Sequence, residues 1–159
     1  MSGRRQHRRL PAIPLSEWPE LFASLGVASV VEIGLRTTTL PRLARLLGTP
    51  LSVPDPDARD VAPAEPQEPM VLPDSAQRQI RATMRILRRW PFGDTCLRQA
   101  LISGQRMRRL APSLHVGVAR VDGEMRAHAW LVIHDRVVDP SFAASSYRTL
   151  TALPNRLTT

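Results

Sequence analysis

The sequence predicts one α+β domain with a small helical region in front of it. Apolar residues recur at helical spacing as far as Pro112, and beyond it they alternate with period two. The chain has 159 residues, of which 43% are hydrophobic and 23% are charged, and these values are typical of one folded domain. A multidomain protein and a wholly disordered chain are therefore both disfavoured.

The first 73 residues divide into a basic tail, a helical region and a linker. Residues 1–13 carry four arginines and no apolar periodicity, so we expect a disordered tail. Residues 14–49 have apolar residues at helical spacing, which predicts two or three short helices, the last ending at Gly48. Residues 50–73 hold seven prolines, five acidic residues and no glycine, a composition that predicts an extended acidic linker.

The remaining residues, 74–159, carry the pattern of the main domain, beginning with two helices. The first helix spans about 75–90, is capped by Asp74 or Ser75, and ends before Pro91. The second helix follows a short loop. Its apolar stripe begins at Leu97, which places Cys96 in its first turn.

Beyond Pro112 the period of two predicts three antiparallel strands joined by two-residue turns. The strands are 114–121, 126–133 and 136–139, and the turns are Asp122–Gly123 and His134–Asp135.

The second turn predicts which residues of the last two strands face each other. If residues 134–135 form a two-residue turn, Trp130 pairs with Asp139. His128 shares a face with Trp130, so Asp139 lies diagonally beside His128 and its carboxylate can hold one imidazole nitrogen. Asp135 lies in the turn itself and points away.

Cys96, His128 and Asp139 together have the three roles required for covalent chemistry at a carbonyl: nucleophile, base and orienting carboxylate. A helix N-terminus and a nearby imidazolium both favour the reactive thiolate. The backbone N–H of Cys96 can help to bind an oxyanion, and Gln99 and the indole of Trp90 are candidates for a second donor.

Each of these residues also has a structural interpretation. A lone cysteine is more often a small buried apolar residue, and His128 can simply satisfy a core hydrogen bond. Asp139, which precedes Pro140, can be a turn residue that ends a strand. The order of the three residues, with the cysteine opening a helix and the histidine inside a strand, favours the chemical interpretation.

The chain carries a formal net charge of +8, and all of its 22 basic residues are arginines. Nine of them lie in residues 74–110, which hold only two acidic residues. This region can face an acidic peptide, the acidic linker, a partner protein or nucleic acid, or it can be a solvated surface. Nucleic acid is disfavoured because the chain has only seven aromatic residues and no recognised binding motif.

Cysteine content and hydropathy limit the cellular context. Because Cys96 is the only cysteine, an intramolecular disulfide and a zinc site built from several thiolates are excluded. No continuous apolar stretch has the length of a membrane span, and the basic N-terminus is not followed by an apolar signal core. We therefore expect a cytoplasmic protein that does not enter a membrane.

Three runs of the main domain resemble the lasso peptide leader peptidases, which are transglutaminase-like cysteine proteases. The runs are Thr95–Leu101, Leu114–Val118 and Ala127–Val132, and the resemblance covers about residues 75–150. It implies a transglutaminase- or papain-like cysteine peptidase core, preceded by a small N-terminal helical region.

The resemblance also implies a function. The activity would be removal of the leader from a ribosomally made precursor peptide, with Cys96 as nucleophile, His128 as general base and acid, and Asp139 as orienting carboxylate. No metal or organic cofactor is expected. The implied partners are the precursor, a separate leader-recognition protein of winged-helix type and the ATP-dependent lasso cyclase, because the chain resembles the stand-alone form that lacks a recognition domain.

Two other classes of function fit the same residues. The first is an amide-forming acyl transfer on the same fold, which dependence on an amine acceptor would distinguish from hydrolysis. The second is a basic binding module without catalysis, which a thiol-reactive probe would separate from both enzymes.

Overall fold

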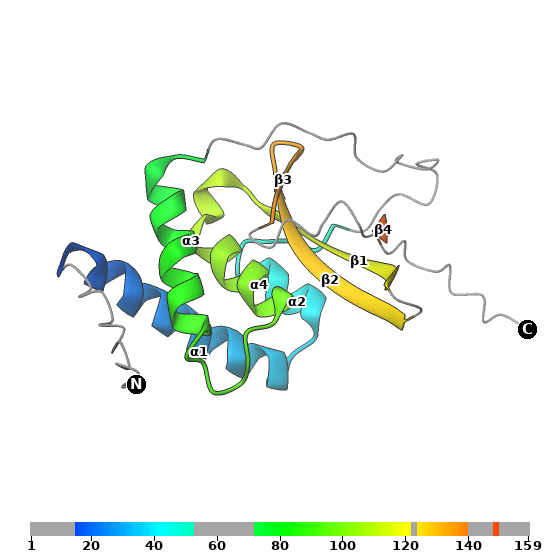
Figure 1. The fold of residues 1–159 in the computed structure, drawn as a ribbon, viewed down its shortest axis with the longest axis horizontal. Coiled ribbons are helices and arrows are strands. Elements are labelled where there is room, and N and C mark those ends of the chain that lie inside the picture. Colours follow the sequence, from blue (N-terminus) through cyan, green and yellow to red (C-terminus); the bar gives the residue numbers. More distant parts are fainter. Residues whose placement is uncertain (1–14, 53–71, 122–123, 140–147, 150–159) are drawn as a thin grey trace, which may run out of the picture.

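The protein folds as an α+β domain in the computed structural model, which describes residues 15–52, 72–121, 124–139 and 148–149 (Figure 1). The helices gather at one side and the sheet lies at the other, so the predicted fold class is confirmed.

Two helical turns and four α-helices are followed by the strands of one sheet. The helical elements are η1 (Leu15–Glu17), α1 (Trp18–Thr37), α2 (Leu40–Leu46), α3 (Asp74–Leu87), α4 (Cys96–Arg106) and η2 (Arg108–Leu110). The strands are β1 (Ser113–Val121), β2 (Glu124–Ile133), β3 (Arg136–Val138) and β4 (Arg148–Thr149), in the sheet order β3-β2-β1-β4. The first three strands lie where the period of two predicts them, whereas β4 is not predicted.

Some of the predicted regions fall outside the described residues. These are the basic tail 1–13, most of the linker 50–73 and the Asp122–Gly123 turn. The boundaries of the tail, of 14–49, of the linker and of the main domain 74–159 stay predictions.

Helix α1 is a single element of 20 residues, so the prediction of only short helices for residues 14–49 is wrong. Its contacts with α3 and α4 stabilise a continuous helix despite the helix-weakening Gly26 and Gly34 in its interior. Helix α1 is long and apolar enough to cross a membrane, and the core helix of a soluble protein can have the same length and hydropathy.

Two glycines position α2 beside α1. A Cβ atom at Gly34 would lie 2.4 Å from Cδ1 of Leu43, so a larger residue there would force the Leu43 side chain to move. After α2, Gly48 has a φ of 73°, a left-handed conformation that ends the helix where the sequence predicts.

Helices α3 and α4 occur where the sequence predicts them, with differences at their ends. Asp74 is the first residue of α3 rather than its cap, because Pro73 holds the cap position and no side chain bonds there. The helix ends at Leu87, three residues early, in a turn closed by a 2.9 Å hydrogen bond from Trp90 N to Leu87 O. Helix α4 begins at Cys96 and has Thr95 as its cap.

Strand register agrees with the prediction between β2 and β3. Val132 pairs with Val137 and Leu131 with Val138, and Asp139 follows directly. On the other side of β2, antiparallel pairing with β1 places Trp130 opposite His115 and His128 opposite Gly117. Helix α4 packs on this sheet and, on its other side, contacts α1.

Three ion pairs join the N-terminal helices to α3 and α4. They are Glu17–Arg85, Glu20–Arg106 and Glu32–Arg98. Part of the basic region therefore faces acidic residues of the same chain, a partner that the sequence does not predict. Because arginine stays charged at every physiological pH, the arginine side of these pairs does not titrate.

Candidate active site

Cys96 is the first residue of α4 and its thiol is partly buried. The helix begins there because Thr95 leaves the helical conformation and its hydroxyl accepts a hydrogen bond from the N–H of Arg98, at 3.4 Å. The first N–H groups of a helix have no partner within it, and together with the helix dipole they favour a negative charge at this position. The structure thus places Cys96 in the first turn of this helix, as predicted.

His128 and Asp139 form a buried pair. Nε2 of His128 lies 2.9 Å from Oδ2 of Asp139, and the two side chains are 8% and 3% exposed. The hairpin turn brings them together, since His134 and Asp135 both adopt left-handed conformations and close it in two residues. Asp135 itself is exposed in that turn. The diagonal contact is therefore formed by Asp139, the carboxylate that the register selects.

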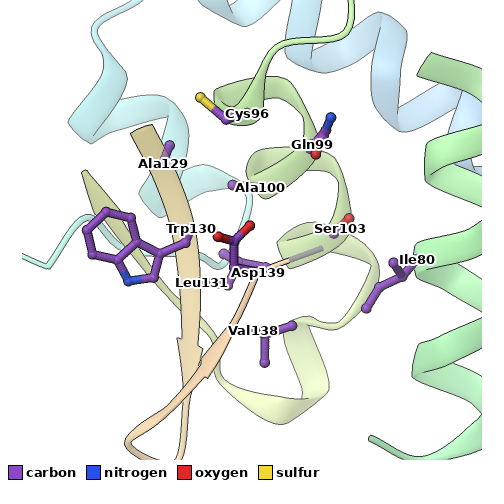
Figure 2. A pocket seen from close by; sticks show the side chains of 10 residues that line it. All are labelled: Ile80, Cys96, Gln99, Ala100, Ser103, Ala129, Trp130, Leu131, Val138 and Asp139. Carbon is purple, nitrogen blue, oxygen red and sulfur yellow. The ribbon is translucent and has the colours of Figure 1, made fainter. Parts of the chain in front are cut away.

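A small pocket lies between α4, β2 and the end of β3. Cys96 and Asp139 both line it, whereas His128 does not. Figure 2 shows the Asp139 carboxylate directed toward the beginning of α4. Asp139 therefore lines the same pocket as Cys96 and is also hydrogen-bonded to His128.

Three rings stack on the face of the sheet that carries His128. The centroid of the Trp130 ring lies 6.0 Å from the ring centroid of His128 and 6.0 Å from that of His115, and the interplanar angles are 22° and 23°. Figure 2 shows the indole pointing away from α4, whereas the neighbouring Leu131 belongs to the core and contacts α4 near Gly104. The imidazole of His128 is thus held between an aromatic neighbour and a carboxylate.

His115 is a member of this stack that the sequence analysis did not select. Its pKa is lowered by burial, which favours the neutral imidazole. The Ser113 hydroxyl donates to the carbonyl of Val132 at 3.3 Å, and its oxygen lies 3.2 Å from Nε2 of His115, which can donate to it. The sequence could have indicated this contact, because a two-residue turn at 122–123 pairs residue 115 with Trp130.

The two candidates for a second oxyanion donor lie in different places. Gln99 lines the pocket with Cys96, but its amide nitrogen donates to Asp94 Oδ1 at 2.6 Å. Trp90 lies instead in a groove between α1 and the end of α3, lined also by Leu25. Trp90 is therefore not placed to serve Cys96.

A second buried carboxylate lies beside the first turn of α4. Glu32 accepts hydrogen bonds from Arg98 Nε at 2.9 Å and from Arg36 Nε at 3.0 Å. The bond from Arg98 is the main reason that the pKa of Glu32 lies below its usual value. This contact joins α4 to α1 two residues from Cys96.

Metal ligands do not gather in the described part of the chain. Among residues 15–52, 72–121, 124–139 and 148–149, no group of three His, Cys, Asp or Glu side chains could hold a metal ion.

A cysteine at a helix start, a histidine on a strand and a carboxylate just after the adjacent strand form an arrangement compatible with a cysteine peptidase or an acyl transferase. Residues 29–153 match the family model described as the transglutaminase-like superfamily, and the chain belongs to that superfamily. Comparison with curated proteins and with solved structures finds no significant match. The match extends from within α1 to beyond β4 and includes all three candidate residues.

Proposed function

We propose that this protein is a cysteine peptidase that removes the leader from a ribosomally synthesised lasso peptide precursor. The observation that carries the proposal is the 2.9 Å contact between His128 and Asp139 beside the pocket that holds Cys96. The superfamily supports thiol-dependent chemistry at a carbonyl. The choice of substrate is supported by the resemblance of the runs around Cys96 and His128 to leader peptidases.

The contact suggests roles for the two imidazole nitrogens of His128. In the proposed mechanism an ionised Asp139 accepts this hydrogen bond, so Nε2 of His128 would carry the proton and Nδ1 would be the basic nitrogen. Nδ1 would take the thiol proton, and the step requires Nδ1 and the thiol to come within hydrogen-bond distance when substrate is bound. Asp139 would then stabilise the imidazolium.

The proposed reaction has two halves. Sulfur of Cys96 bonds to the last carbonyl carbon of the leader, the carbon–nitrogen bond breaks, and His128 gives its proton to the departing amine. Water then bonds to the same carbon, the carbon–sulfur bond breaks, and the proton from water returns to the site through His128. The backbone N–H of Cys96 would bind the oxyanion in both halves.

The partners and location follow from the same proposal. The protein would act in the cytoplasm with a separate winged-helix protein that holds the leader, and it would release the core to an ATP-dependent cyclase. A peptidase that relies on such a partner would be slow alone, because binding energy from remote parts of a substrate can be required for catalysis.

Mass spectrometry of a precursor peptide, incubated with this protein and its leader-binding partner, tests the proposal. We expect cleavage at one site that Cys96→Ala abolishes and that Leu46→Ala, at an exposed position on α2, leaves unchanged. An intact precursor despite demonstrated leader binding by the partner would contradict the proposal. A product that contains an added amine would instead identify the amide-forming alternative, and a thiol that resists alkylation would favour a binding module.

A further inference from the structure

Helix α1 exposes an apolar face on the side away from α3 and α4. Trp18, Phe22 and Ile33 are 44%, 61% and 62% exposed, and they lie four, eleven and fifteen residues apart, on one side of the helix. A helix that is apolar all round is normally covered on all sides. Among the elements that the structure describes, α3, α4 and α2 pack against the other side of α1, and none of them covers this exposed face.

A groove continues this surface toward α3. It has a volume of about 340 Å³, and its apolar lining comes from both helices and from the turn after α3. The apolar lining residues are Leu21, Leu25, Ile86, Trp90 and Pro91. We call the exposed face and this hollow together the α1 groove. A concave apolar site accepts protruding side chains, as in complexes where an amphipathic helix binds in a groove.

The charges at the α1 groove are predominantly positive. Arg85 and Arg89 line it, and Arg36 lies at its far end with its guanidinium 4.4 Å above the ring of Phe92. Glu17 and Glu32 are ion-paired with Arg85 and Arg36, and within the described part of the chain no carboxylate pairs with Arg89. The groove therefore has an excess of positive charge.

The positive charge distinguishes between three possible binding partners for the groove: a second copy of the chain, a lipid surface and a helix of another protein. A second copy of the chain would bring the same arginines together, which disfavours self-association. A lipid surface would satisfy the charge, but a flat bilayer does not fill a hollow between two helices. An amphipathic helix with acidic flanks satisfies both the hollow and the charge.

We propose that the α1 groove docks an amphipathic helix of a partner protein, with the apolar face of that helix in the groove and acidic side chains beside the arginines. The proposal does not depend on the peptidase function, because the groove and the pocket of Cys96 have no lining residue in common.

Fluorescence anisotropy with labelled helical peptides of about 18 residues, long enough to span about 27 Å, tests the docking. Three peptides share one leucine face and differ only in having Glu, Gln or Lys at the flanking positions. We expect the Glu peptide to bind at least about tenfold more tightly than the Lys peptide. Phe22→Ser and Ile33→Ser, at exposed positions that leave the core intact, should each weaken binding, whereas Leu46→Ser, at an equally exposed position on α2, should not.

The role of charge is tested with Arg89→Glu, which should reverse the preference for the Glu peptide over the Lys peptide. Absence of binding by the Glu peptide, or equal binding of all three peptides, would overturn the proposal. So would a dimer that Phe22→Ser abolishes, which identifies a second copy as the occupant. Binding to phosphatidylglycerol vesicles that exceeds binding to the Glu peptide and is lost in Phe22→Ser would identify a lipid surface instead.

Discussion

Two buried carboxylates in this molecule make similar contacts with different partners. Glu32 accepts from Arg98 at 2.9 Å, and Asp139 lies 2.9 Å from His128. Their side chains are 9% and 3% exposed. The first contact joins α1 to α4, and the second joins β2 to the residue that follows β3.

The partner decides what each contact can do. A guanidinium does not release its proton in a protein, so the Glu32 contact can only hold helices together. An imidazole exchanges its proton near neutral pH, so the Asp139 contact can support proton transfer. The same geometry is thus structural at α1 and suited to chemistry at the sheet.

The largest effect should come from Asp139→Asn, which keeps the shape of the side chain and removes its charge. We expect peptide cleavage to slow by about 10²- to 10⁴-fold, because the amide no longer stabilises the imidazolium or holds its tautomer. The kcat/KM on the precursor measures this. The matched variant is Asp135→Asn in the exposed turn, which should keep the wild-type rate. Equal rates for the two variants would show that Asp139 is not the carboxylate that orients His128.

Glu32→Gln is the corresponding change at the structural contact. Its main effect should be a lower thermal unfolding midpoint, because Arg98 and Arg36 lose their charged partner. Since the folded-state pKa of Glu32 is below the usual 4.5, its stabilising contribution is present above that pH and is lost as pH falls through the folded value. Glu32→Gln should therefore flatten the acid side of the stability profile.

Calorimetry at several pH values between about 2 and 7 measures this change, with Glu124→Gln as a control at an exposed strand residue. An unchanged midpoint for Glu32→Gln, or a loss of cleavage as large as that of Asp139→Asn, would remove the distinction between the two carboxylates.

Trp130→Leu should have a smaller effect on cleavage than Asp139→Asn. The indole stacks on His128 and limits the orientations of the imidazole, and an aromatic pair contributes about 0.5–1.5 kcal/mol, or up to about tenfold in rate. Trp130→Phe keeps a ring and should recover most of the rate. If Leu and Phe give the same rate at matched stability, Trp130 has only a packing role.

The sequence predicted local features more fully than contacts between distant residues. The turn at His134–Asp135 and the alternation along β2 were sufficient to place Asp139 beside His128, because register follows from a two-residue turn. The start of α4 followed from the apolar spacing that begins at Leu97, whereas its cap at Thr95 was not predicted.

Packing between distant segments explains what the sequence did not predict. The continuity of α1 depends on its contacts with α3 and α4, and Glu32 and Arg98 are separated by 66 residues. No periodicity within α1 indicates that its acids meet those arginines. The stack on Trp130 was predictable in principle, but it required pairing β1 with β2 as well as β2 with β3.

The smallest effect concerns His115 at the outer end of that stack. Burial lowers its pKa below 6.5, so the folded state binds fewer protons than the unfolded state as pH falls below that value. Stability should therefore be greatest above about pH 6.5 and decline toward lower pH, and His115→Phe should reduce this part of the decline while keeping a ring against Trp130. Urea denaturation at closely spaced pH values measures the difference, with His134→Asn as control, because it removes an exposed imidazole and tolerates the left-handed conformation of that turn. A steeper decline in His115→Phe would mean that His115 becomes charged in the folded protein, and its contact with the Ser113 hydroxyl would then stabilise an imidazolium.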